Sequence, residues 1–348
     1  MARAQVVGLD IGDTQLRAVE LALDTSDPQR SPVIQRYAEI DLAPEAVRDG
    51  VVARRAEVAD AVKNLWNRNR FATKDVILGL GGQRVVAREA TLPSAPLDSL
   101  RKALPFTVQD MIMVPVDQCQ LDFYPLYEVE GQVTGLLVAV PTEAVESNIE
   151  VVLDAGLKPV RVDLAAFGLV RALARGQFQH GVVGIVDVGA DMTTVVVAQN
   201  GEPVITRILP TGGRLITDQI ARTLGIPQHH AERLKIEVAL MNPGEGNAQA
   251  QGAFSVIAEK CQALVEQVAR TFSFYGQSSG HTVEHVVISG RGGMLNGLGQ
   301  YISTALRLPA SFSALDSSFS VQRSAKSMTP EGRMSLPVAV GLAMGVAA

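Results

Sequence analysis

Residues 180–213 read HGVVGIVDVGADMTTVVVAQNGEPVITRILPTGG, which is the most informative stretch of the chain. It predicts three strands in close succession, at residues 182–186, 192–199 and 204–209. The first strand is apolar throughout, which is typical of a strand covered on both faces. Asn200 and Gly201 separate the second strand from the third, and this pair between two β-rich runs is a strong hairpin signal.

The turn between the first two strands, at residues 187–191, has a composition suited to binding phosphate. Gly189 and Ala190 let a ligand approach the backbone closely, and successive N–H groups in such a turn form an anion-binding nest. Asp187 ends the strand, where its carboxylate is placed to hold a magnesium ion through water. Asp-x-Gly also occurs in ordinary turns, so one copy alone leaves both interpretations open.

The same pattern occurs a second time near the N-terminus. Residues 6–21 read VVGLDIGDTQLRAVEL, in which an apolar strand again meets Asp-x-Gly, at Asp10 and Gly12, and leads directly into another strand. Two equivalent hairpins far apart in one chain predict two similar half-folds that face each other across a cleft. A nucleotide would bind between them, with each turn holding its phosphates from one side.

A third element fits this arrangement. Residues 286–289 predict a strand, and residues 290–298 read GRGGMLNGL, a glycine-rich turn that enters a helix. The free backbone N–H groups at a helix start are a ready site for part of a nucleotide.

In this order and spacing, the three motifs resemble the phosphate-1, phosphate-2 and adenosine motifs of the actin-like ATPase superfamily. Over nearly its whole length the chain resembles the PilM family, the cytoplasmic actin-like proteins of type IV pilus assembly. Further stretches that carry this resemblance are residues 136–173, 210–226 and 336–345.

The resemblance implies an α/β protein with the actin-like ATPase fold, in which two ribonuclease-H-like lobes surround a nucleotide cleft. It also implies an inserted α+β subdomain like that of the cell-division protein FtsA, as a docking place for a partner protein. We expect lobe one at residues 1–83, 158–178 and 333–348, the inserted subdomain at 84–157, and lobe two at 179–332.

Three further segments carry predictions of their own. The uncharged run at 335–348 predicts a buried helix that packs into lobe one. The polar, glycine-rich run at 241–254 predicts a mobile loop before a long amphipathic helix at 255–275. The serine-rich run at 314–330 predicts a surface loop.

The resemblance implies bound ATP or ADP with magnesium, which Asp10 and Asp187 would hold through water. The expected nucleotide-binding residues come from the three motifs, a glycine pair and one helix, and they are Asp10, Gly12, Asp13, Thr14, Gln15, Arg17, Asp187, Gly189, Ala190, Asp191, Thr193, Gly212, Gly213, Glu232, Lys235, Gly290, Arg291, Gly292 and Met294. Glu232 and Lys235 fall where the family contacts the ribose or base. Charges three residues apart are also common on a solvated helix face, so both interpretations stay open for this pair.

The chain departs from the family pattern at four of these positions. Asp13 stands where a small hydroxyl residue is usual, Asp191 where serine or glycine is common, Arg17 where lysine is usual, and Arg291 in place of a glycine. A carboxylate ~5 Å from a phosphate charge costs roughly 3 kcal/mol at an effective dielectric of 20. Two such carboxylates offset most of a micromolar affinity of about 8 kcal/mol, unless they face magnesium or point away. The two arginines would compensate in part.

Hydrolysis needs a side chain that orients the attacking water, and the family takes it from the segment at 160–172. Asp163 is the sole acid there, followed by Leu-Ala-Ala-Phe, which makes it a weak catalytic candidate. We therefore expect nucleotide binding with very slow or absent turnover.

Composition sets the remaining bounds. The 348 residues include 47% hydrophobic and 19% charged residues, which is ordinary globular composition and enough for two lobes. The net charge of -5, without a dense basic run, argues against general nucleic-acid binding. Cys119 and Cys261 fit a reducing compartment, and neither a signal peptide nor a membrane span of ~20 residues is predicted.

We therefore expect a scaffold at the cytoplasmic face of the inner membrane. The resemblance implies that it binds the cytoplasmic N-terminal peptide of the membrane protein PilN and links the inner-membrane complex to the pilus motor proteins. The alternatives are an FtsA-like division protein and a small-molecule kinase of the same superfamily. The FtsA family uses a basic amphipathic C-terminal helix, whereas this chain ends GLAMGVAA, and the inserted module shows no kinase signature.

Overall fold

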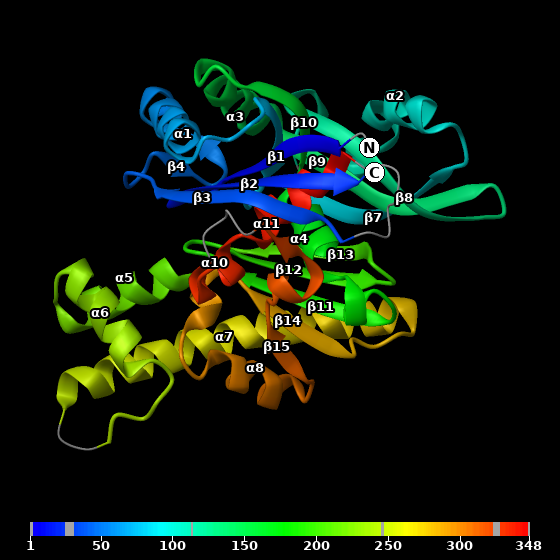
Figure 1. Cartoon of the computed structure of the whole chain (residues 1–348). Coiled ribbons are helices and arrows are strands. Elements are labelled where there is room, and N and C mark those ends of the chain that lie inside the picture. The colour runs from blue at the N-terminus through cyan, green and yellow to red at the C-terminus, as the bar shows by residue number, and fades with distance from the viewer. Residues whose placement is uncertain (1–2, 25–30, 113, 245–246, 323–327, 347–348) are drawn as a thin grey trace.

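The computed structural model of the chain describes residues 3–24, 31–112, 114–244, 247–322 and 328–346. Figure 1 shows a blue sheet and a green-to-orange sheet in two separate parts of the molecule, with the red C-terminal helices between them. We call the part with the blue sheet lobe one and the other part lobe two. Among the described helices, none is long and apolar enough to cross a membrane.

The sheet of lobe one has six strands in the order β10-β6-β1-β2-β3-β16. These are β1 (Arg3–Ile11), β2 (Gln15–Asp24), β3 (Val33–Asp41), β6 (Asp75–Leu80), β10 (Lys158–Leu164) and β16 (Ser320–Val321). The first three form an antiparallel meander, whereas β6 and β10 run parallel to β1 on its other side. β16 pairs with β3, although its residues were expected in lobe two.

The sheet of lobe two has five strands in the order β13-β12-β11-β14-β15. These are β11 (Val182–Val188), β12 (Thr193–Gln199), β13 (Glu202–Leu209), β14 (His285–Ser289) and β15 (Ala310–Phe312). The three strands predicted from the opening stretch are confirmed as an antiparallel meander, and β14 and β15 extend the sheet in parallel. Both lobes thus carry an Asp-x-Gly hairpin at the centre of a similar sheet.

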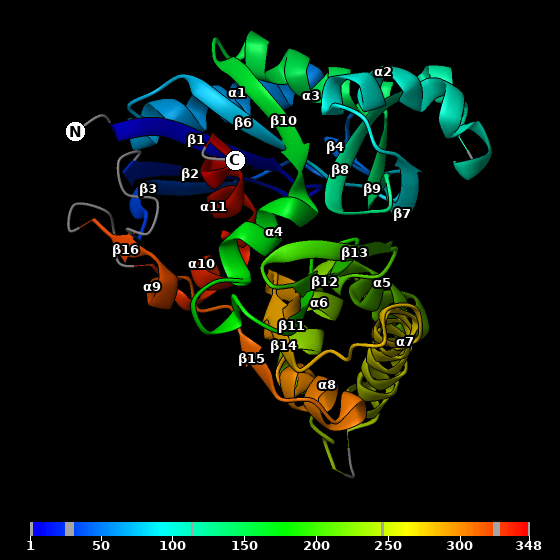
Figure 2. The ribbon, with the colours of Figure 1, turned by 90° about the vertical axis from the view of Figure 1, so that its right-hand side faces the viewer.

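A third, smaller sheet has the order β7-β9-β8. Its strands are β7 (Val86–Pro93), β8 (Cys119–Val129) and β9 (Gln132–Pro141), and it carries the helix α2 (Leu97–Thr107). The helix α3 (Thr142–Asp154) follows β9 and packs mainly on lobe one, where Val151 and Val152 join the core. Figure 2 shows β7 lying beside β13 of lobe two. The hydroxyl of Tyr124 on β8 donates a hydrogen bond to the Glu202 carboxylate at the start of β13. Leu136 of β9 packs with Leu80 and Leu164 of lobe one, so this α+β module contacts both lobes.

The remaining elements of lobe one lie between β3 and β6. They are β4 (Val47–Arg48), β5 (Val51–Val52) and α1 (Arg55–Asn69), and α1 packs against α3. Val58, Val62 and Leu65 recur at helical spacing and are all buried, so this face of α1 covers the sheet.

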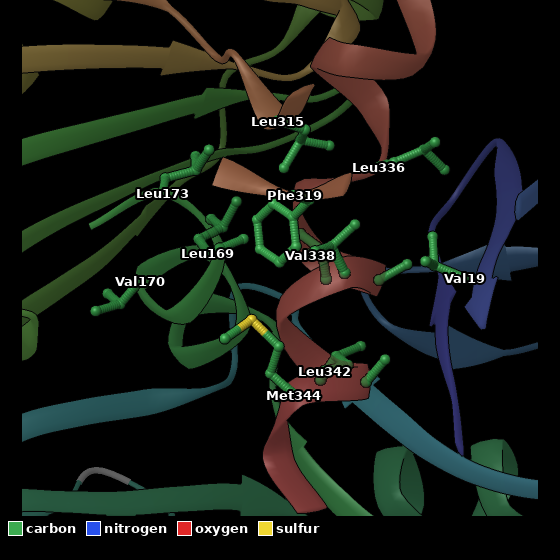
Figure 3. Packing of buried hydrophobic residues seen from close by; sticks show 14 of the residues in the cluster. Val19, Leu169, Val170, Leu173, Leu315, Phe319, Leu336, Val338, Leu342 and Met344 are labelled. Carbon is green, nitrogen blue, oxygen red and sulfur yellow. The ribbon is translucent and has the colours of Figure 1, made fainter. Parts of the chain in front are cut away.

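The two lobes share one hydrophobic core around α4 (Ala165–Leu173) and α11 (Pro337–Ala343). Figure 3 shows Leu169, Phe319 and Val338 lying together in this core. The helices approach backbone to backbone, since a Cβ on Gly341 would lie 1.7 Å from the carbonyl oxygen of Gly168. The predicted buried helix near the C-terminus is confirmed, apart from residues 347–348, which lie outside the described residues.

The helices of lobe two cover its sheet. They are α5 (Gly213–Leu224), α6 (Gln228–Val238), α7 (Ala248–Ser279) and α8 (Leu298–Leu306), and the shorter α9 (Leu315–Ser318) and α10 (Pro330–Ser335) follow them. The structure corrects the loop predicted at 241–254, because α7 begins at Ala248, where the Asn247 side chain caps it. Residues 245–246 lie outside the described residues.

The surface loop predicted at 314–330 is also wrong in part. Leu315 and Phe319 are buried and belong to the core shared by the two lobes. Residues 323–327 of this segment lie outside the described residues. The serine content of the run favoured a surface loop, whereas tertiary packing buries its two apolar side chains.

Candidate nucleotide site

The two Asp-x-Gly turns make the same backbone hydrogen bond. The Gly12 N–H donates to the carbonyl of Gln15 at 3.0 Å, and the Gly189 N–H donates to the carbonyl of Met192 at 2.9 Å. A Cβ would lie 3.2 Å from the acceptor carbonyl oxygen at Gly12 and 2.9 Å from it at Gly189. A larger residue would therefore be crowded in both turns. The repeated sequence pattern therefore corresponds to a repeated turn, one in each lobe.

The glycine pair before α5 packs directly on the turn of lobe two. The Gly213 N–H donates to the carbonyl of Gly189 at 3.0 Å, and the Arg214 N–H donates to the carbonyl of Ala190 at 2.8 Å. A Cβ on Gly212 would lie 2.3 Å from the Ala190 carbonyl oxygen. Glycine at 212 thus lets the loop before α5 close against the turn.

Three contiguous cavities form a path from lobe two into the space between the lobes. The base-side cavity has a volume of about 430 Å³, the central cavity about 890 Å³ and the inner cavity about 120 Å³. The residues that line both the base-side and the central cavity are Gly213, Glu232, Lys235, Arg291 and Gly292. Those that line both the central and the inner cavity include Asp10, Thr14, Arg17, Asp187, Gly189, Ala190 and Asp191.

The cavities differ in chemistry along this path. Apolar side chains dominate the lining of the base-side cavity, namely Ile216, Ile236, Leu264, Met294, Leu295 and Leu298. The inner cavity is formed by the two turns with their carboxylates. The path therefore leads from an apolar pocket to a polar end, which is the polarity of a nucleotide from base to phosphates.

Lys235 and Glu232 belong to a hydrogen-bonded group between the base-side and central cavities. Lys235 Nζ lies 2.8 Å from Glu232 Oε2, 3.0 Å from Thr217 Oγ1 and 3.1 Å from the Gly213 carbonyl oxygen. The Thr217 hydroxyl also donates to Glu232. Lys235 is buried, so the alternative of a solvated pair of helix charges is wrong for it.

Arg17 and Asp10 form an ion pair at the turn of lobe one. Arg17 Nη1 lies 2.9 Å from Asp10 Oδ2, and Arg17 Nη2 donates to Gln15 Oε1 at 3.2 Å. The buried Nε of Arg17 has no hydrogen-bond partner, its closest carboxylate oxygen being that of Glu39 at 3.8 Å. A buried guanidinium nitrogen without a partner, beside the central cavity, suits an anionic ligand such as a phosphate.

Asp187 lies at the end of β11, where it lines both the central and the inner cavity. Burial raises the pKa of its carboxyl to about 6, and the charge of Arg17 lowers it only in part. Within the described residues, no three or more metal-binding side chains come together. Asp10 and Asp187 therefore fit a magnesium ion whose remaining ligands are water and phosphate oxygens.

The two unusual aspartates face each other. Asp13 of lobe one and Asp191 of lobe two both line the inner cavity, and burial together with the charge of Asp191 raises the pKa of Asp13 to about 6. Arg214 holds Asp191 with two parallel bonds, one of them from Nε to Oδ1 at 2.6 Å. The carboxyls of Asp13 and Asp191 thus lie close together at the cleft.

The other unusual residue of lobe two, Arg291, joins the lobes. Arg291 Nη2 lies 2.9 Å from Glu39 Oε2 on β3, and the Ser335 hydroxyl donates to the other oxygen of Glu39. Arg291 lines both the base-side and the central cavity, so this ion pair lies beside the path of the ligand.

All the predicted nucleotide-binding residues except Thr193 line at least one of the three cavities. The hydroxyl of Thr193 is buried and donates to the carbonyl of Thr211 at 2.7 Å, so it supports the sheet rather than the cleft. Asp163 is also absent from these linings, because its carboxylate pairs with Arg171 at 2.5 Å on the side of α4. Their predicted roles in binding and catalysis gain no support from their positions.

Sequence reasoning missed several residues of the cleft. Arg214 follows the predicted glycine pair at once, and its charge was a usable signal. Lys260, Cys261 and Leu264 of α7 line the base-side cavity, but they come from the middle of a long helix and share no local motif.

The sequence profile of the family described as "Type IV pilus assembly protein PilM" matches residues 8–346 of the chain. The chain belongs to the PilM family. A solved structure described as a "PilM-PilN type IV pilus biogenesis complex" matches it with a TM-score of 0.85 at 25% sequence identity, over 100% of both chains. The predicted family is therefore confirmed.

Other relatives of this PilM-family chain are more distant. The cell-division protein FtsA of Streptococcus pneumoniae is 25% identical over 260 residues, which are 66% of this chain and 54% of FtsA. The match thus spans about half the length of that curated relative. MreB5 of Spiroplasma citri, solved with bound AMPPNP, has a TM-score of 0.54 at 12% identity over 90% of this chain and 92% of its own. That likeness shows the fold alone, and the predicted actin-like ATPase fold is confirmed.

Proposed function

We propose that the chain is a nucleotide-binding scaffold of type IV pilus assembly, which takes ATP or ADP with magnesium into the cleft between its lobes. The observation that carries the proposal is the path of three contiguous cavities, which starts in an apolar pocket and ends at two equivalent Asp-x-Gly turns. The base would occupy the base-side cavity, and the phosphates would run past Gly213 and Gly292 to the turns. Asp10 and Asp187 would hold the hydrated magnesium ion, which neutralises phosphate charge.

The same geometry leads us to expect very slow or absent hydrolysis. A water-orienting side chain would have to come from the start of α4, where Ala165 and Leu169 line the inner cavity. Neither can accept a proton or a hydrogen bond through its side chain. A steady-state rate of ~1 per second or more, the ordinary enzyme range, would contradict this part of the proposal.

The partner is inferred from the family and from the related PilM-PilN complex. We infer that the chain binds the cytoplasmic N-terminal peptide of PilN and links the inner-membrane complex to the motor proteins of the pilus. It would then be a cytoplasmic protein, peripheral at the inner membrane through its partners. The small α+β module at residues 84–157 is the expected docking region.

Two titrations of the full chain test the proposal separately. Calorimetry with ATP and with ADP, in magnesium, should show binding to one site. Calorimetry with the N-terminal peptide of PilN should show binding that a scrambled peptide of the same composition does not. Failure of the peptide alone would remove the pilus partner and leave the nucleotide site standing.

A further inference from the structure

We propose that Asp13 and Asp191 make the cleft prefer a nucleoside diphosphate to the corresponding triphosphate. The inference rests on the proposed nucleotide-binding function and concerns which phosphate chain that site accepts. Both residues are departures from the pattern of the superfamily, and one belongs to each lobe. The structure brings them to the same place, the wall of the inner cavity.

The direction of the cavities decides which phosphate meets these residues. A base in the apolar base-side cavity leaves the polyphosphate chain to extend through the central cavity. The last phosphate of the longest chain then reaches the inner cavity, which is the end of the path and holds only about 120 Å³. A diphosphate ends one phosphate earlier, in the wider central cavity.

The inner cavity already carries an excess of negative charge. Its charged lining consists of the carboxyl groups of Asp10, Asp13, Asp187 and Asp191 and the guanidinium of Arg17. Asp10 forms an ion pair with Arg17, and Asp191 forms one with Arg214. Among the residues that the structure describes, they leave Asp13 and Asp187 at this cavity without an ion pair.

A magnesium ion offsets the charge of Asp187, but it does not remove that of Asp13. The Asp13 carboxyl lies beside the Asp191 carboxyl at the wall of this cavity, so a terminal phosphate entering there meets the carboxylate of Asp13, which no ion pair among the described residues neutralises. Like charges repel more strongly in a partly buried site than in water. Because Asp13 lines the inner cavity and not the central one, its repulsion acts on the terminal phosphate and spares a ligand that lacks it.

The test is calorimetry of the full chain with ADP and with ATP, both with magnesium, on the wild type and on Asp13→Asn. Asparagine keeps the shape of the side chain but removes the charge. Asp60→Asn is the matched control, because Asp60 is 71% exposed on α1 and lines none of the three cavities. Circular dichroism at the same concentrations checks that each variant is folded.

We expect the wild type to bind ADP at least about tenfold more tightly than ATP, a ratio that corresponds to 1.4 kcal/mol. In Asp13→Asn the ratio should fall to about threefold or less, mainly through tighter ATP binding, and the control should keep the wild-type ratio. Equal binding of ADP and ATP by the wild type would overturn the inference and leave the nucleotide site intact.

Two other outcomes separate the inference from the function on which it rests. If neither the wild type nor the variant binds any nucleotide, the proposed function itself is wrong. If only Asp13→Asn binds, the carboxyl pair excludes every nucleotide, which contradicts a preference for the diphosphate.

Discussion

Arg291 of lobe two donates a hydrogen bond to Glu39 of lobe one, with 2.9 Å between nitrogen and oxygen. Asp13 and Asp191 lie together at the wall of the same cleft, where burial and the charge of Asp191 raise the pKa of Asp13. Arg291, Asp13 and Asp191 all depart from the family pattern. The ion pair of Arg291 with Glu39 thus links the two lobes through a side chain that the family pattern lacks.

The link between Arg291 and Glu39 should contribute modestly to stability. The Arg291 side chain is 43% exposed, and exposed ion pairs are worth about 0.2–1 kcal/mol. A double-mutant cycle with Arg291→Met and Glu39→Gln, followed by urea denaturation, should give a coupling free energy in that range that shrinks in 1 M salt. A coupling that is absent, or unaffected by salt, would show that the pair does not hold the lobes together.

Lys235→Met should weaken nucleotide binding. The ammonium group stands between the base-side and central cavities, and charged hydrogen bonds contribute about 1.5–3 kcal/mol, or roughly tenfold or more in affinity. Calorimetry with ADP measures the loss. Lys158→Met is the matched control, since its side chain is 73% exposed on lobe one, and it should bind ADP like the wild type. Equal losses in both variants would point to a nonspecific effect of charge.

Gly341→Ala should destabilise the core that the lobes share. The new Cβ would lie 1.7 Å from the Gly168 carbonyl oxygen, so the helices must move apart, at a cost of about 3 kcal/mol. Gly276→Ala in α7 is the control, because its Cβ meets nothing closer than 3.5 Å and alanine is the better helix former by about 1 kcal/mol. Urea denaturation measures both, and a stable Gly341→Ala variant would mean that α4 and α11 do not pack as described.

The stability contribution of Asp13 should depend on pH. Burial and the charge of Asp191 raise the pKa of its carboxyl from 3.8 to about 6 in the folded chain. The folded state therefore holds this proton more tightly than the unfolded state, so the contribution is complete below about pH 4 and is lost as the pH rises through about 6. Between pH 7 and pH 5, the wild type should gain free energy of unfolding relative to Asp13→Asn. Urea denaturation at the two pH values measures this, and an unchanged difference would contradict the buried pair.

The fold was predictable from the sequence because its decisive motifs are local. A strand, a glycine turn and a second strand follow one another without a gap at Gly12 and again at Gly189, and the backbone geometry repeats with the sequence. The family then followed from the order of three such motifs. The cleft residues of these motifs could be named for the same reason.

The errors have a tertiary cause. The helix α7 begins at Ala248, before its predicted start at residue 255. The prediction was late because Gly252 made that segment resemble a loop. A Cβ at Gly252 would lie 2.7 Å from a side-chain carbon of Leu224, so the glycine lets α7 pack against α5 and does not mark a turn. The partners Glu39 and Arg291, or Asp13 and Asp191, are far apart in the chain, and no local pattern shows that they meet.

We expect the cleft to bind a nucleotide in the full chain. Calorimetric titration of the wild-type protein with ADP in magnesium, with Lys235→Met measured beside it, tests this expectation. The wild type should bind one ADP per chain, and the affinity of the variant should be at least tenfold lower. A folded wild-type protein that takes up no ADP or ATP even at millimolar concentration would contradict it.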